Sequence, residues 1–243
     1  MNNLKIIGTS HIAIESINEI KNTFNQYNPD IVAIELDQKR LLMLVSKQKK
    51  QKTSLRKIFE IGLQGYLFYV IGHWAEKKLG DIVKVKPGTD MMTAFKLAKK
   101  NNKQVALIDQ DIEITLKKLS KGITWKEKWN FISDIFSAFV LRKKEKIDFN
   151  LNNVPDEKVI KKLINKTKKK YPNIIRILVD ERNKIMAKRL AIIIKTNPQK
   201  KIMAIVGAGH EKEMLELIKK YIKTIEIPNT ITYNYNIQNQ QIL

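Results

Sequence analysis

Short apolar runs alternate with longer amphipathic stretches along most of the chain. Four of these runs have the length of a buried strand and are rich in Ile, Val and Ala, and most are followed by apolar residues at helical spacing. Strands that alternate with helices are typical of crossover connections and parallel pairing. The pattern therefore predicts an α/β fold with a mainly parallel central sheet flanked by helices. We expect its strands at residues 4–8, 31–36, 104–108 and 202–206.

Two long helical segments interrupt this alternation. Residues 55–80 contain an apolar run that is shorter than the roughly 20 residues a membrane span needs. We expect a buried or hairpin-forming helix there, with His73 as an ordinary core or surface histidine. Residues 125–196 also show helical patterns, broken near residues 150–157 and at Pro172. The sheet is thus predicted to carry a large helical insertion.

We expect a single domain over residues 1–243, with helical portions at about 55–100 and 124–196 inserted around the sheet. A chain of this length can bury a substantial core. The polar and basic stretch 47–54 is the best candidate for a mobile loop or a subdomain boundary.

Polar residues at the starts of the amphipathic stretches predict helix caps. Ser16 and Glu19 have the spacing of a capping box, Asp37 can cap the helix after the second strand, and Thr89 can cap the next one.

The net charge of +22 raises the question of binding to nucleic acid or to an anionic membrane surface. Only six of the 46 basic residues are Arg, whereas base reading and phosphate clamping favour the Arg guanidinium. No helix-turn-helix, zinc-finger or RNP-like sequence is present. We therefore expect solvated lysine surfaces without sequence-specific nucleic-acid recognition, and membrane-surface association as a lesser alternative.

The cellular setting follows from two further features. The chain has no Cys, so its fold depends on no disulfide and no thiolate chemistry is available. Its first residues lead directly into an apolar strand, without the features of a signal peptide. We expect a cytoplasmic protein without a transmembrane segment in this chain. The oligomeric state stays open, a homodimer being one alternative.

Two Gly-x-x-His sequences, GTSH at residues 8–11 and GAGH at 207–210, each follow a predicted strand. Glycine lets the chain turn sharply, so each histidine should lie beyond the carboxyl edge of the sheet, where open α/β sheets bind ligands. Glu35 lies near the carboxyl end of another apolar strand, where a carboxylate needs a partner or a metal. Together, His11, Glu35 and His210 would form a ligand set suited to Zn²⁺, Mn²⁺, Co²⁺ or Fe²⁺.

Each of these residues also has a purely structural explanation. His210 can begin the helix that follows it, His11 can bond to a loop carbonyl, and Glu35 can pair with Arg40 or a lysine. The shared site and the separate structural roles both remain open on the spacing alone.

Three further ionisable residues occupy positions that suit a site. Asp109 follows the third strand at the same predicted edge, although it can equally cap the next helix. Glu181 and Arg182 lie on a helix among apolar residues, where a buried charge usually needs a partner. A structural ion pair or an exposed helix face explains these two residues as well as a functional role does.

Several of these sequences together resemble the TraB/PrgY family, within the wider TraB/GumN/Tiki group. The resemblance covers nearly the whole chain and runs in order through GTSHIAIES, PDIVAIELDQKRL, KPGTDMMTAFKLAKK, ALIDQDIEITLKKL, DERNKIMAKRL and IVGAGH. Gln110 stands where the family tends to have Arg, and Asn183 where it often has Asp. The roles of these two residues are therefore open.

The resemblance implies a chemistry as well as a fold. The bacterial founders are linked to shutdown of peptide pheromone signalling, and the Tiki branch consists of metal-dependent peptidases that use two Gly-x-x-His motifs and a glutamate. Those positions match His11, His210 and Glu35. More distant relatives include an esterase-like, histidine-dependent group and haem-iron-uptake proteins. Many members continue into C-terminal membrane segments, so we expect either a naturally soluble member or a shortened chain.

Two functions follow. The first is a metal-dependent hydrolase, most plausibly a peptidase acting on short peptides with Mn²⁺, Co²⁺ or Zn²⁺. In it, Asp109 or Glu181 would move the proton, and Arg40 or Arg182 would steady the oxyanion or a substrate carboxylate. The second is a non-catalytic protein that binds and sequesters a peptide, with the histidines as hydrogen-bonding groups.

Overall fold

The central feature of the computed structural model is one four-stranded, entirely parallel sheet. The structure describes residues 3–9, 14–46, 88–140 and 165–226. The strands lie in the order β1-β4-β2-β3. The predicted α/β class and parallel sheet are confirmed. The strands are β1 (Leu4–Thr9), β2 (Ile31–Ile34), β3 (Gln104–Leu107) and β4 (Ile202–Gly207).

Helices make up most of the remaining described residues. They are α1 (Ile14–Tyr27), α2 (Gln38–Val45), α4 (Thr89–Lys100), α5 (Ile112–Gly122), α6 (Trp125–Val140), α8 (Pro172–Ile175), the π-helix η1 (Arg176–Asp180), α9 (Glu181–Thr196) and α10 (Ala208–Thr224). The elements from α6 to α9 agree with the predicted helical region 125–196 where the structure describes it. The predicted helix at 55–80, with His73, and the break at 47–54 lie outside the described residues.

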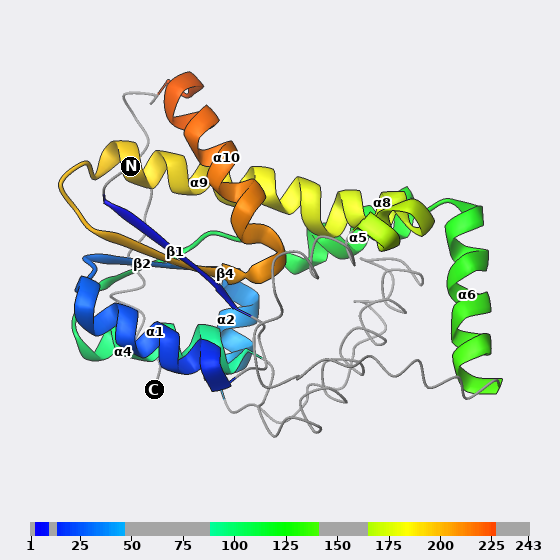
Figure 1. Ribbon diagram of the computed structural model, residues 1–243, viewed down its shortest axis with the longest axis horizontal. Helices are drawn as coiled ribbons and strands as arrows, with labels where there is room; N and C mark the ends of the chain where they lie inside the picture. Colours follow the sequence, from blue (N-terminus) through cyan, green and yellow to red (C-terminus); the bar gives the residue numbers. More distant parts are fainter. Residues whose placement is uncertain (1–2, 10–13, 47–87, 141–164, 227–243) are drawn as a thin grey trace.

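Two layers of helices cover the two faces of the sheet (Figure 1). Helices α1, α2 and α4 contribute to one core, and α9 and α10 to the other. Alternate residues of β4 divide between them: Met203 and Ile205 join the first core, whereas Ile202, Ala204 and Val206 join the second. Both faces of β4 are buried, which explains its unbroken apolar sequence.

The starts of the helices agree only in part with the predicted caps. Asp37 caps α2 as predicted, since its carboxylate accepts a bond from the Arg40 backbone N–H at 3.0 Å. Helix α1 begins earlier than expected, so Ser16 is a fully buried residue inside its first turn. Gly88, with φ of 77°, occupies the cap position of α4, and Thr89 is the first helical residue. A left-handed backbone suits glycine, and this explains the correction.

Within residues 3–9, 14–46, 88–140 and 165–226, no helix has both the length and the apolar character of a membrane span.

One buried carboxylate joins the starts of α6 and α8. Glu127, 2% exposed, accepts bonds from the backbone and side chain of Thr124 at 3.0 and 2.9 Å. It also accepts bonds from the backbone and side chain of Asn173 at 2.7 and 3.0 Å. Burial raises the pKa of Glu127, but these hydrogen bonds outweigh it and the pKa is lowered. Both helix ends thus depend on one ionised group.

Replacing Glu127 with Gln should lower the free energy of unfolding by about 1–3 kcal/mol, because donors at two helix ends lose a charged acceptor. A carboxyl whose pKa is lowered by folding stabilises the fold above its unfolded pKa of about 4.3 and loses that contribution as the pH falls through the folded value. Between about pH 5 and pH 3, the free energy of unfolding measured in urea should fall more steeply for the wild type than for the variant. Glu113→Gln, at an exposed ion pair with Lys39, is the matched control. Parallel pH curves for the wild type and Glu127→Gln would contradict the assignment.

Candidate functional site

The candidate site lies at the carboxyl edge of the sheet, where three strands end side by side. Strands β1 and β2 both pair with β4: Thr9 is opposite Gly207, and Ile34 is opposite Ile205. The segments that carry the two Gly-x-x-His motifs and Glu35 therefore leave the sheet next to one another. His11 itself lies outside the described residues, so its approach to the other two side chains stays a prediction.

Glu35 follows the last residue of β2 and is 4% exposed. Its Oε2 accepts a bond from the Gly207 backbone N–H at 2.6 Å, and its Oε1 is bound by Nη2 of Arg182. Gly207 is the cap residue of α10, so the carboxylate lies at the positive end of that helix. Nε2 of His210 is 3.4 Å from Glu35 Oε1. Glu35 thus meets a helix start, a guanidinium and an imidazole.

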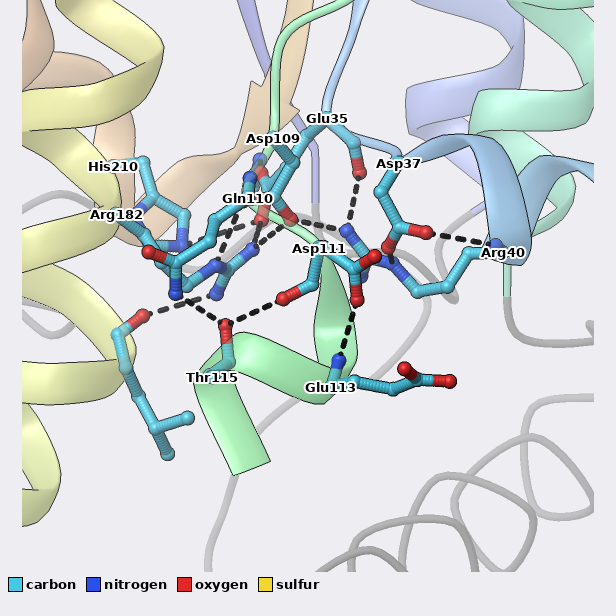
Figure 2. A network of polar contacts seen from close by, with 12 residues as sticks. Glu35, Asp37, Arg40, Asp109, Gln110, Asp111, Glu113, Thr115, Arg182 and His210 are labelled. Atoms are coloured by element: carbon cyan, nitrogen blue, oxygen red, sulfur yellow. Dashed lines mark hydrogen bonds and ion pairs between the residues drawn. The ribbon is translucent and has the colours of Figure 1, made fainter. Parts of the chain in front are cut away.

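Asp109, 2% exposed, is a second buried anion beside Arg182. Arg182 contacts both of its carboxylate oxygens, from Nε at 3.0 Å and from Nη2 at 2.8 Å. Arg40 binds the same carboxylate through Nη2 and binds Asp37 through Nε at 2.7 Å. Figure 2 shows the side chains of Glu35, Asp109, Arg40 and Arg182 converging. Two anions, each buried, therefore share one guanidinium.

Arg182 remains a cation in this setting. Burial lowers its pKa, but the charges of Glu35 and Asp109, and the hydrogen bonds to them, raise it further. The net effect is an upward shift of the pKa, so the guanidinium stays charged wherever the two carboxylates are ionised.

The alternative that Glu35 pairs with Arg40 is met only at the backbone. Arg40 donates to the backbone carbonyl of Glu35 at 3.3 Å and not to its carboxylate.

His210 is held from its other side by Asn183. Asn183 is fully buried; its Nδ2 donates to Glu213 Oε2 at 2.8 Å, and its Oδ1 is 2.6 Å from His210 Nδ1. Because Asn183 presents its oxygen, His210 Nδ1 must be the donor, and in the neutral ring Nε2 then carries the lone pair. That lone pair faces Glu35. A proton or a cation between Nε2 and Oε1 would remove the repulsion between them.

Two other sequence predictions, a catalytic role for Glu181 and a capping role for Asp109, can be compared with the structure. Glu181 forms ion pairs with Lys118, at 2.8 Å, and with Arg176, whereas its neighbour Arg182 binds the two buried carboxylates. Asp111, not Asp109, caps α5, since it accepts the Glu113 backbone N–H at 2.7 Å. Asp109 is therefore available to the network.

The sequence pattern did not assign roles to Gln110 and Asn183. Gln110 bonds through its amide to Thr115 at 2.8 Å and accepts from Lys118 at 3.2 Å. Asn183 orients His210, as described above. A buried amide next to an arginine in a largely apolar helix is the signal that could have identified Asn183.

The glycine of the first motif has a close neighbour from the second. A Cβ atom at Gly8 would overlap the carboxylate Oε2 of Glu211 and come within 3.1 Å of Ala208 Cα. Glycine at this position therefore lets β1 approach the start of α10.

Replacing Arg182 with Met should cost about 3–5 kcal/mol of folding free energy, because two buried carboxylates lose their shared cation. Arg176→Met is the matched control: its side chain, 48% exposed, pairs with Glu181, and an exposed pair contributes below about 1 kcal/mol. Urea unfolding of both variants measures the difference. Equal losses of unfolding free energy in Arg182→Met and Arg176→Met would mean that Arg182 does not balance the buried anions.

Comparison with known proteins places the chain in a family. The model of the TraB/PrgY/gumN family matches residues 2–221. A relative, the uncharacterized protein MJ1365 of Methanocaldococcus jannaschii, is 32% identical over 231 residues, which are 93% of this chain and 55% of the relative. The chain thus spans about half the length of that protein. Since the family model extends from β1 to α10 and includes both Gly-x-x-His motifs, the chain belongs to the TraB/PrgY/gumN family.

Proposed function

We propose that this protein is a metal-dependent hydrolase that acts on short peptides, with His11, Glu35 and His210 as the metal ligands. The observation that carries the proposal is the 3.4 Å separation of His210 Nε2 and Glu35 Oε1. Two ligand atoms that each lie about 2.1 Å from a tetrahedral ion are about 3.4 Å apart. Thr9 pairs with Gly207, so the segment that leads from β1 to His11 begins at the same edge of the sheet.

The donor set suits a divalent ion. Within the described residues no group of three His, Cys, Asp or Glu side chains is arranged to hold a metal ion, and the proposed third ligand, His11, falls outside them. Imidazole and carboxylate donors suit Zn²⁺, Mn²⁺ and Co²⁺. When bound, such an ion would supply Lewis-acid polarisation of a peptide carbonyl group.

The protein's own residues would prepare that chemistry. Asn183 holds His210 in the tautomer whose Nε2 is free of a proton in the neutral ring. The Gly207 N–H fixes Oε2 of Glu35, and Arg182 balances the charge of Oε1 until an ion would take its place. Asp109, which is buried between Arg182 and Arg40, keeps both guanidinium groups at the edge, where they can bind a carboxylate of the substrate.

A second function is favoured by one specific contact. Arg182 already neutralises Glu35 Oε1, so the carboxylate has a cation partner without a metal. On this alternative the protein binds and sequesters a peptide without cleaving it, and the arginines hold the peptide carboxylate. The two functions differ in metal content and in cleavage of a bound peptide.

The test is the metal content of the protein after equilibration with Zn²⁺, Mn²⁺ or Co²⁺ and removal of free ions. We expect about one ion per chain for the wild type and a loss of at least tenfold in affinity for His11→Ala and His210→Ala, because each removes a ligand. His73→Ala should retain the ion and is the matched control. Peptide cleavage should require the same two histidines.

Absence of metal from the wild type, together with unimpaired peptide binding, would contradict the hydrolase and support sequestration. Circular dichroism of each variant separates loss of a ligand from loss of the fold.

Asn183→Ala should weaken metal binding by about 10- to 100-fold, because His210 loses the partner that orients its ring. Glu213→Gln is the matched control, since a glutamine oxygen still accepts the Asn183 amide and His210 keeps its orientation. Metal titration of the two variants measures the effect. Unchanged affinity in Asn183→Ala would show that Asn183 does not position the histidine.

A further inference from the structure

We propose that a basic groove between α5 and η1 binds short peptides that carry carboxylate side chains. This inference goes beyond hydrolysis at the carboxyl edge and does not depend on it. The groove has a volume of about 650 Å³ and is lined from one side by α5 and from the other by η1 and the start of α9. Its size is within the range of about 300–1,000 Å³ typical of ligand sites.

One face of α5 supplies most of the positive charge. Ile114, Lys117, Lys118 and Lys121 follow the spacing i, i+3, i+4 and i+7, so they share a helix face, and all four line the groove. Arg176 adds a fourth basic group from the opposite wall. Against these four cations the lining has a single acid, Glu181, which leaves a net charge of +3 (four minus one).

The opposite wall owes its shape to the π-helical turn. The backbone N–H of Glu181 bonds to the carbonyl of Arg176, five residues earlier, and the two side chains form an ion pair. Such widened turns occur often at functional sites. A Cβ at Gly122 would lie 2.8 Å from Ile177 Cδ1 and 3.4 Å from Arg176 Nη2. Glycine at the end of α5 therefore lets the helix approach this wall closely.

The chemistry of the lining favours an acidic peptide over a phosphate ligand. Three of the four cations are lysines, which attract carboxylate and phosphate alike, so the apolar part of the lining decides between them. The one arginine is already engaged by Glu181. Ile114, 49% exposed, adds apolar surface. A peptide with both carboxylate and aliphatic side chains complements this mixture of charge and apolar surface.

The groove adjoins the buried network at the sheet edge. Lys118 bonds to Glu181 at 2.8 Å and to Gln110 at 3.2 Å. Gln110 follows Asp109, and its backbone N–H donates to the Asp109 carboxylate at 2.7 Å. A peptide held in the groove would therefore lie next to the residues that hold Arg182.

The test is fluorescence anisotropy with a labelled hexapeptide of alternating Glu and Leu, in the presence of EDTA. EDTA removes any metal, so failure of the hydrolase proposal does not affect the result. Lys117→Glu with Lys121→Glu should weaken binding by roughly tenfold or more. Lys219→Glu with Lys220→Glu, on the exposed face at the end of α10, makes the same change in net charge and is the matched control.

Three further measurements complete the test. Ile114→Ser, which leaves the charge unchanged, should weaken binding several-fold, because the leucines lose an apolar contact. A peptide with Gln in place of Glu should bind at least tenfold more weakly. Equal losses of peptide affinity in the two double variants would contradict a binding site in the groove. They would mean that the peptide is attracted only by the net charge of the protein. Stronger binding of a single-stranded oligonucleotide, abolished by the groove variant, would also overturn the choice of an acidic peptide.

Discussion

The carboxyl edge of the sheet depends on balancing the charge of Glu35, a carboxylate that is only 4% exposed. Removing such an anion from water is costly unless cations and donors replace the solvent. Arg182 from α9 and the Gly207 N–H at the start of α10 meet this need. These groups come from distant parts of the sequence, so the charge is balanced only when β2, α9 and α10 are assembled. The same constraint places His210 next to the carboxylate.

The arrangement around Arg182 also raises the question of which cation, Arg182 or a metal ion, is the partner of Glu35. Arg182 and a divalent ion would be alternative partners for the same oxygen of Glu35, because two cations at one oxygen repel each other. Asp109 offers Arg182 a second anchor through two contacts, at 3.0 and 2.8 Å. If Glu35 bound an ion, the guanidinium would keep its two contacts with Asp109. Asn183 keeps the histidine fixed throughout.

The sequence predicts the scaffold well and the network only in part. Strand positions and parallel pairing follow from unbroken apolar runs such as that of β4, whose two faces are both buried, whereas the order of the strands comes from the structure. The placement of Glu35 and Asp109 after adjacent strands also follows from the topology. Their shared partner does not, because Arg182 reaches them from a helix whose rotation depends on packing. Glu181, the neighbouring residue, points to a different partner for the same reason. The role of Asn183 depends on α10, almost thirty residues further on.

An anomalous difference map from a crystal soaked with Zn²⁺ tests the proposed metal site most directly. If His11, Glu35 and His210 form one site, a single strong peak should lie about 2.0–2.2 Å from both imidazole groups and from the Glu35 carboxylate. Arg182 should remain bound to Asp109. Two histidines too far apart for one ion, with Arg182 still on Glu35 and no peak between them, would contradict it.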